Sequence, residues 1–112
     1  MDTVLFDKNA RKTIQGFPKE IKLEFGRLLL SLQKGEKLTM PTSKPMDNVF
    51  RGMAEIRMKD ESCNFRIFYY TRVLRKIIVF HAFKKKGQKT ELKEIKTGQK
   101  RLKIILETTG EL

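Results

Sequence analysis

The sequence predicts an α+β fold: a small, twisted antiparallel sheet with two N-terminal helices packed on one face, and a C-terminal helix. Three short runs rich in β-branched and aromatic residues lie between residues 53 and 86, joined by short polar connectors. Such runs are typical of an antiparallel meander. Apolar residues at helical spacing precede and follow this stretch, which predicts amphipathic helices on both sides of it. With 112 residues, the chain is expected to form a single domain over residues 1–112.

The three predicted strands are Ala54–Lys59, Cys63–Tyr70 and Lys76–Phe83. Because successive side chains of a strand point to opposite faces, one face of this sheet should be apolar and packed. The other face should carry guanidinium groups beside aromatic rings, and it is the candidate working surface. Its expected members on the first two strands are Glu55, Arg57, Lys59, Arg66, Phe68 and Tyr70.

The residues before the meander predict an edge strand and two helices. Thr3–Phe6 is a short apolar run that suits an edge strand. Asp7 or Asn9 can cap a first helix that extends to about Gln15. Pro18 suits the first position of a second helix that Gly35 ends. We expect this helix pair to cover the apolar face of the sheet with a stripe formed by Ile21, Phe25, Leu28, Leu29 and Leu32.

A long loop and a C-terminal helix complete the prediction. Residues 36–50 carry two prolines and several Ser, Thr, Asp and Asn residues, so they are expected to form a loop. Thr90 is a suitable N-cap for a helix that continues to about Glu107. Gly98 should weaken the middle of that helix by roughly 1 kcal/mol.

The charge of the chain points to an anionic partner. Twenty-five Lys and Arg residues against 13 Asp and Glu residues leave a net charge of +12, which favours nucleic acid first and a membrane surface second. The densest positive region lies between residues 84 and 103, where nine Lys and Arg residues face two Glu residues. No run approaches the ~18 apolar residues of a membrane span. The single cysteine and the absence of a secretory pattern lead us to expect a cytoplasmic protein.

Cationic groups interleaved with aromatic residues suit RNA, since cations neutralise phosphates and rings stack on exposed bases. The alternative for Arg57 and Arg66 is that they are solvated residues of a half-exposed sheet. His81 is the only histidine, and it is either structural or an acid–base group. The sequence lacks a Cys/His/carboxylate cluster at ligand spacing and a Gly-rich phosphate loop, so we expect neither a metal nor a cofactor.

Several motifs between residues 44 and 95 resemble the phage-derived, HigB-type branch of the RelE/ParE toxin superfamily. They are Lys44-Pro45, Gly52-Met53-Ala54-Glu55-Ile56-Arg57, Phe65-Arg66-Ile67-Phe68-Tyr69-Tyr70, Val79-Phe80-His81-Ala82-Phe83-Lys84-Lys85-Lys86, Gln88-Lys89-Thr90 and Glu94-Ile95. The resemblance implies a RelE-like toxin that cleaves mRNA in the ribosomal A site and is restrained by a cognate helix-turn-helix antitoxin. One departure is Glu91, where the family commonly has proline.

The resemblance also implies roles for individual residues. Arg57 and Arg66 would hold the scissile phosphate, with Lys84 and Lys85 nearby, in a metal-free attack of the RNA 2′-hydroxyl on its own 3′-phosphate. Proton transfer would fall to His81, to Lys84 or Lys85, or to Tyr70. Further RNA contacts are expected from Lys59, Phe68, Lys86 and Lys89. We expect both guanidinium groups to lie on one face, open to solvent and not locked into internal ion pairs.

Two rival functions fit the same residues. A ParE-like gyrase poison would share the fold but would not need phosphate-binding arginines within the sheet. A non-enzymatic module that binds nucleic acid through its charge would show a steep salt dependence and no cleavage.

Overall fold

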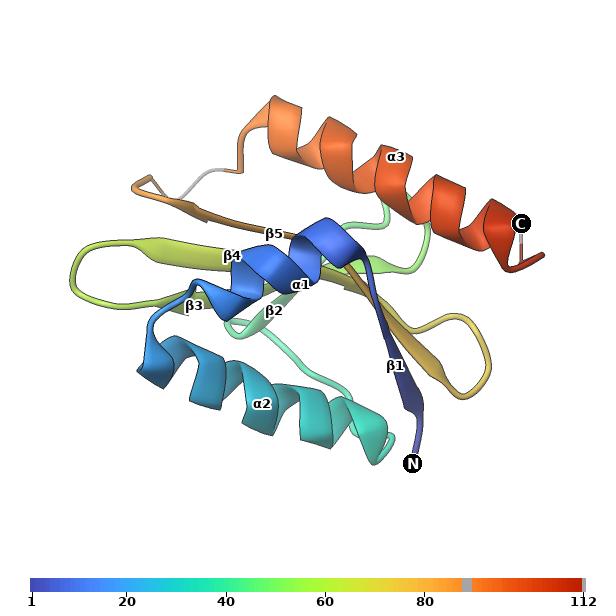
Figure 1. Cartoon of the computed structure of the whole chain (residues 1–112), viewed down its shortest axis with the longest axis horizontal. Coiled ribbons are helices and arrows are strands. Elements are labelled where there is room, and N and C mark those ends of the chain that lie inside the picture. Colours follow the sequence, from blue (N-terminus) through green and yellow to red (C-terminus); the bar gives the residue numbers. More distant parts are fainter. Residues whose placement is uncertain (88–89, 112) are drawn as a thin grey trace.

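The computed structural model of the chain describes residues 1–87 and 90–111. Its elements in chain order are β1 (Thr3–Phe6), α1 (Lys8–Gln15), α2 (Lys19–Gln33), β2 (Ser43–Pro45), β3 (Met53–Lys59), β4 (Asn64–Tyr70), β5 (Lys76–Lys85) and α3 (Leu92–Thr108). Figure 1 shows the sheet between two helical layers, with α3 on one side and α2 on the other. The α+β class predicted from the sequence is confirmed.

The five strands form one sheet in the order β1-β5-β4-β3-β2. The predicted meander of β3, β4 and β5 is antiparallel throughout. The N-terminal edge strand pairs in parallel with β5, with Thr3 opposite Lys76 and Phe6 opposite Val79. The sheet is therefore mixed, whereas the sequence analysis predicted a purely antiparallel one. The predicted loop also contains β2, which is three residues long and pairs with β3 at the other edge.

The N-cap of α1 agrees with the sequence prediction, whereas the N-cap of α3 differs from it by one residue. Asp7 is the N-cap of α1, where its Oδ2 accepts a hydrogen bond from the Ala10 backbone N–H at 2.9 Å. The N-cap of α3 is Glu91 and not Thr90. The Thr90 hydroxyl instead donates to Oε2 of Glu55 at 2.7 Å, so this side chain links the start of α3 to β3.

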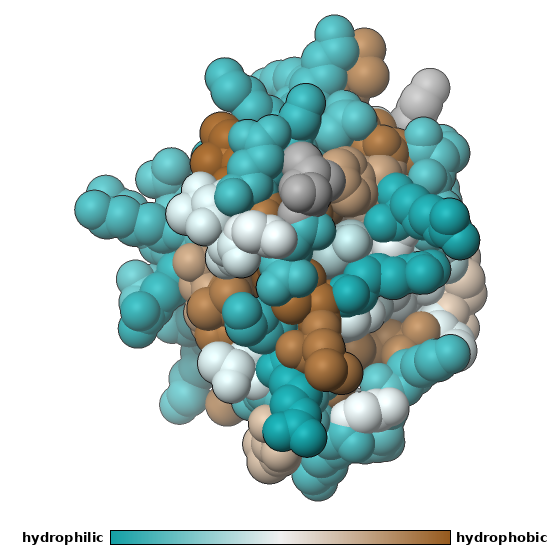
Figure 2. Space-filling view, turned by 90° about the vertical axis from the view of Figure 1, so that its right-hand side faces the viewer, coloured by the Kyte–Doolittle hydropathy of each residue, from teal (hydrophilic) through white to brown (hydrophobic). Residues whose placement is uncertain are grey.

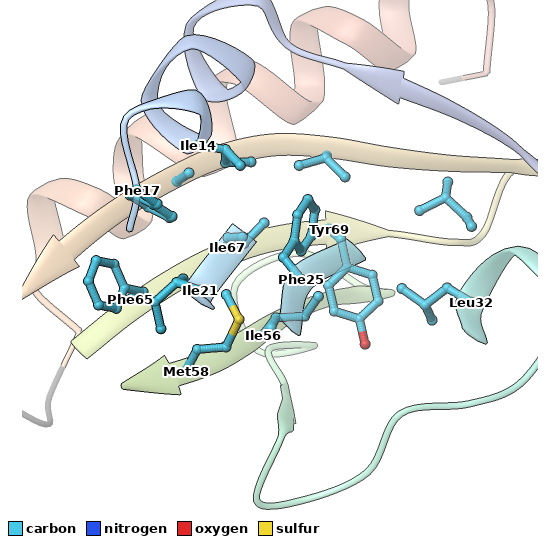
Figure 3. Packing of buried hydrophobic residues seen from close by; sticks show 13 residues of the cluster. Ile14, Phe17, Ile21, Phe25, Leu32, Ile56, Met58, Phe65, Ile67 and Tyr69 are labelled. Carbon is cyan, nitrogen blue, oxygen red and sulfur yellow. The ribbon is translucent and has the colours of Figure 1, made fainter. Parts of the chain in front are cut away.

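The first hydrophobic core lies between the sheet and the pair α1–α2, as predicted. Ile21, Phe25 and Leu32 of α2 pack with Ile56 and Ile67 from the centre of the sheet (Figure 3). Phe17, in the connection between the two helices, contacts Phe65 edge-on, with the ring centroids 5.0 Å apart. The apolar face of the alternating strands is thus the face that α1 and α2 bury.

A second core lies on the opposite face, under α3. Leu102 and Leu106 of the helix pack with Phe68, Phe80 and other buried residues of the sheet. A β-bulge contributes to this packing, because the β4–β5 register passes from Phe68↔His81 to Tyr69↔Val79 and leaves Phe80 without a partner. The extra residue lets Phe80 and His81, although adjacent, both lie toward α3.

The outer surface is mostly hydrophilic. Figure 2 shows the end of the molecule that carries the β4–β5 connection, where teal residues cover most of the face and brown groups lie between them. This distribution fits the high net charge of the chain. Within residues 1–87 and 90–111, none of the helices has the length and apolar character needed to cross a membrane.

Candidate functional site

Two arginines lie side by side on the face of the sheet that α3 partly covers. Arg57 of β3 stands directly opposite Arg66 of β4 in the ladder. Residues that oppose each other in an antiparallel pair project from the same face, with Cβ atoms about 5 Å apart. The alternation in the sequence predicted this shared direction, and the register confirms it.

A buried carboxylate lies between the two guanidinium groups. Glu55 is two residues before Arg57, and its Oε1 is 3.5 Å from Arg57 Nε and 3.6 Å from Arg66 Nε. Its other oxygen accepts the hydroxyl hydrogen bond of Thr90. Glu55 is 2% exposed. The sequence analysis placed it on the working face but gave it no role, although its parity with Arg57 was a usable signal.

A lysine completes this cluster from the third strand. Lys85 of β5 pairs with Asn64, so it lies next to Arg66 along the same face. Its Nζ is buried and makes no hydrogen bond with any residue that the structure describes. Burial lowers the pKa of the Lys85 ammonium from its ordinary value, and the charge of Arg66 lowers it further against the opposing effect of Glu55.

We call Glu55, Arg57, Arg66 and Lys85 the arginine cluster. Three cations against one carboxylate leave it with two positive charges. A hollow of about 300 Å³ opens beside it, lined by Arg57 and Arg66 together with Pro41, Thr42, Met58, Lys59 and Asn64. A second hollow, of about 260 Å³, borders Glu55 and Arg57 on the side of α3. Fixed cations at the wall of an open hollow can hold an oxyanion without much reorganisation.

The two arginines differ in their access to solvent. The Arg57 side chain is 24% exposed, whereas that of Arg66 is 2% exposed. The expectation that both groups are open to solvent is therefore correct for Arg57 and wrong for Arg66, and both pair with Glu55, contrary to the expectation of no internal ion pair. Burial lowers the pKa of Arg66, and Glu55 opposes this shift, but a guanidinium remains protonated in proteins. Arg57 is the direct contact that the cluster offers, and Arg66 is the charge beneath it.

The family model for the phage-derived protein Gp49-like family (DUF891) matches residues 12–103. The chain belongs to this Gp49-like family. The match covers the end of α1, all of α2, the meander and most of α3, and it confirms the resemblance to a phage-derived branch that the motifs between residues 44 and 95 predicted.

Two solved structures are similar to this Gp49-like chain. The isolated E. coli RelE toxin has 15% identity and a TM-score of 0.49, over 95% of this chain and 100% of that one. The intact E. coli RelBE toxin–antitoxin complex has 16% identity and a TM-score of 0.46, over 80% of this chain and 100% of that one. Comparison with curated proteins gave no match.

Both ring nitrogens of His81 in this Gp49-like chain are engaged by residues of α3. Its ring is 5% exposed and lies between β5 and α3. Arg101 donates to Nδ1 at 2.8 Å, so the hydrogen is on Nε2, which donates to Oε1 of Glu94 at 2.9 Å. Burial lowers the pKa of His81, the Glu94 hydrogen bond opposes the shift, and the Arg101 charge adds to it. A neutral imidazole with both nitrogens engaged is withdrawn from proton transfer.

Three further predicted site residues lie outside the arginine cluster. Phe68 is fully buried in the core under α3, so the prediction that it stacks on RNA is wrong. Lys84 pairs with Phe65 of the first core, which places it on the opposite face from Arg66, because adjacent strand residues alternate. Tyr70 shares the face of Arg66, but it is four residues along β4, about 13 Å away, and packs edge-on against Phe50.

Two of the expected RNA-binding lysines lie within the described residues, and both are exposed. Lys59 is exposed and lines the first hollow. Lys86 is exposed just beyond β5, where the Asn64 amide donates to its carbonyl oxygen at 3.2 Å. Lys89 lies outside the described residues. Among those described, no group of three or more His, Cys, Asp or Glu side chains is placed to hold a metal ion.

Proposed function

We propose that this chain is the toxin of a type II toxin–antitoxin system, an endoribonuclease that cleaves mRNA in the ribosomal A site and so inhibits translation. The observation that carries the proposal is the in-register pair Arg57–Arg66, which lies beside an open hollow. The arginine cluster that contains this pair has an excess of two positive charges. The motifs shared with the HigB-type toxins and the family membership of the chain support the same function.

The proposed reaction is a transesterification without a metal ion. The 2′-hydroxyl of the message attacks the adjacent phosphorus, the bond to the 5′-oxygen breaks, and negative charge builds on the non-bridging oxygens. Arg57 contacts these oxygens from the wall of the hollow, while Arg66 adds its charge from below. Because Glu55 and the sheet hold both groups in place, little reorganisation is needed as the charge develops.

Lys85 is the proposed proton donor. Its ammonium is buried beside Arg66, and a lowered pKa makes an ammonium a better acid. It protonates the leaving 5′-oxygen, and the 2′-hydroxyl proton passes to water or to a group of the ribosome. We do not assign this role to the other candidates of the sequence analysis: both ring nitrogens of His81 are engaged, Lys84 lies on the opposite face, and Tyr70 is too distant.

The proposed partners follow from this function. The message on the ribosome is the substrate, which places the protein in the cytoplasm, and a cognate helix-turn-helix antitoxin restrains it. A folded toxin with a net charge of +12 suits an antitoxin that presents an acidic surface.

The test is cleavage of a defined message on translating ribosomes. Arg57→Ala should slow cleavage by about 10²–10³-fold, the cost of losing one such contact, and Lys85→Met should slow it similarly. Arg57 is the better target than Arg66, since truncating a buried cation also disturbs folding. Lys12→Ala, which removes an exposed charge from α1, is the matched control and should cleave normally.

Cleavage by Arg57→Ala within about twofold of the wild type would overturn the phosphate role. The same proteins are incubated with gyrase and plasmid. Accumulation of cleaved DNA while the message stays intact would replace the nuclease proposal with a gyrase poison.

A further inference from the structure

The outer face of α3 carries a stripe of lysines that the proposed reaction does not use. Lys93, Lys96, Lys100 and Lys103 are all exposed. Their spacing of three, four and three residues places them on one side of the helix, over about 15 Å of its length. The buried residues Gly98, Leu102 and Leu106 lie on the other side. The helix thus binds the sheet with one face and presents a line of positive charge with the other.

Most of this charge has no counterion among residues 1–87 and 90–111. Lys93 is 3.9 Å from Glu91, and both side chains are largely exposed, so that ion pair contributes little. Lys96, Lys100 and Lys103 form no ion pair with the residues that the structure describes. Lys96 and Lys100 are four residues apart, an arrangement of like charges that destabilises a helix. A surface of this kind attracts an anionic ligand more strongly than a face on which the two signs alternate.

A hollow beside the stripe adds an aromatic ring. It has a volume of about 430 Å³ and is lined by Phe50, Lys96, Gln99, Lys100 and Lys103, which we call the α3 groove. Gln99 donates to the carbonyl oxygen of Val49 at 3.0 Å and so fastens the loop that carries Phe50 to the helix. Phe50 is half-buried. A ring held among ammonium groups combines a stacking platform for a base with contacts for the phosphates on either side.

Residues adjacent in the chain line the α3 groove and the hollow that borders the arginine cluster. The hollow that borders Glu55 and Arg57 is also lined by Val49 and Ile95. The next residues along the chain, Phe50 and Lys96, line the α3 groove. A nucleic-acid strand held at Arg57 could therefore pass over Val49 and Ile95 to the lysine stripe.

We propose that the α3 groove binds single-stranded RNA that flanks the scissile phosphate. Single-stranded RNA fits better than a duplex, because a base must be unpaired to reach the half-buried ring of Phe50. The groove supplies affinity and holds the message in line with the arginine cluster, while the cluster carries out the cleavage. The inference rests on the proposed function for the position of the cut, but RNA binding by the groove is measured separately from cleavage.

The experiment measures RNA binding by fluorescence anisotropy over a range of salt concentrations, with a fully 2′-O-methylated decanucleotide that cannot be cleaved. The test variant is Lys96→Gln/Lys100→Gln/Lys103→Gln. The control variant is Lys12→Gln/Lys19→Gln/Arg27→Gln, which removes three exposed charges from α1 and α2 on the other side of the sheet. Both variants have the same net charge, so a general effect of charge would act on them equally.

The test variant should bind the decanucleotide about tenfold more weakly than the control near physiological salt. The slope of log K against log salt should fall in magnitude by about 2, since each phosphate contact on a single strand contributes about 0.7. A trinucleotide that fills only the arginine cluster should bind both variants equally. Phe50→Leu should also weaken binding of the decanucleotide but leave the salt slope unchanged, because stacking releases no counterions.

Equal affinities and slopes for the test and control variants would overturn the proposal, even if Arg57→Ala abolishes cleavage as proposed. If the test variant instead loses only the binding of the antitoxin, the groove is a protein-docking surface and the proposal also fails. A loss of RNA binding confined to the test variant would support the groove even if wild-type protein cleaved no message, so the two proposals fail separately.

Discussion

Replacing Glu55 by Gln should weaken the fold and strengthen anion binding at the same time. Gln has nearly the same size as Glu but carries no charge. Its amide can still accept the hydrogen bond from Thr90, so the main loss is the negative charge between Arg57 and Arg66. The substitution therefore isolates the electrostatic role of the carboxylate.

The magnitude follows from the burial and the distances. Two unit charges 3.6 Å apart attract each other by about 5 kcal/mol at an effective dielectric constant of ~20. Removing the buried carboxylate also removes its desolvation cost, and measured losses for one partner of a buried pair are about 3–5 kcal/mol. Arg57 is partly solvated, so the loss of its attraction to Glu55 contributes less to the destabilisation than the loss of the attraction between Glu55 and Arg66. We expect Glu55→Gln to lower the free energy of unfolding by about 3 kcal/mol.

The same change raises the net charge of the arginine cluster from two to three, so phosphate should bind more tightly. Urea unfolding with and without inorganic phosphate measures both effects, because a ligand of the folded state adds RT ln(1 + [L]/Kd) to its stability. Phosphate should restore more stability to Glu55→Gln than to the wild type. Glu61→Gln, at an exposed position of the β3–β4 turn, should change neither quantity.

The reasoning would be refuted if Glu55→Gln unfolded within about 0.5 kcal/mol of the wild type and phosphate stabilised both proteins equally. In that case the carboxylate would not be coupled to the guanidinium groups.

Substitutions at three further positions test how the helices are packed, hydrogen-bonded and capped. A Cβ on Gly98 would lie 2.5 Å from the ring of Phe68. Gly98→Ala should therefore lower the free energy of unfolding in urea by about 1–2 kcal/mol, because the overpacking outweighs a helix-propensity gain of ~1 kcal/mol. A variant more stable than the wild type would contradict this. The pKa of His81 is lowered in the folded state, so the stability of the fold should fall as the pH drops below about 6.5. His81→Asn should make that decline less steep, which thermal unfolding between pH 7 and 5 measures. Asp7→Ala should cost about 1 kcal/mol through the lost N-cap, while Asp7→Ser, measured in the same way, should keep most of it.

The alternation of side chains was enough to predict the three strands of the meander and the face that Arg57 and Arg66 share. Local chemistry also predicted an N-cap at Asp7 or Asn9, of which the structure has Asp7, and the helix stripe that covers the first core. These features depend on residues close together in the sequence or on the period of two along a strand, so a pattern can reveal them.

The features that the sequence did not reveal depend on contacts between distant segments. Phe68 shares the parity of Arg66 and was expected to face RNA, but α3 covers it from thirty residues further along the chain. Counting residues along β5 misses the bulge at Phe80, which turns His81 toward α3. Glu55 is an ordinary outward-facing residue in the alternation, and only its burial between two strands and Thr90 shows that it is a partner of the arginines.

The position of α3 explains why one face of the sheet can be both core and site. Because Gly98 has no side chain, α3 lies close over Phe68 and covers the middle of that face. Toward the ends of β3 and β5, beyond the first turn of α3, the same face stays open to the hollow beside Arg57. The helix thus forms an apolar wall next to Arg57, which remains accessible. Charges at the edge of a low-dielectric core act more strongly than charges in water. The packing of α3 on the sheet should therefore also strengthen the attraction of the arginine cluster for a phosphate. Loosening α3, as Gly98→Ala should do, is therefore expected to weaken phosphate binding although the substitution touches none of the residues of the cluster.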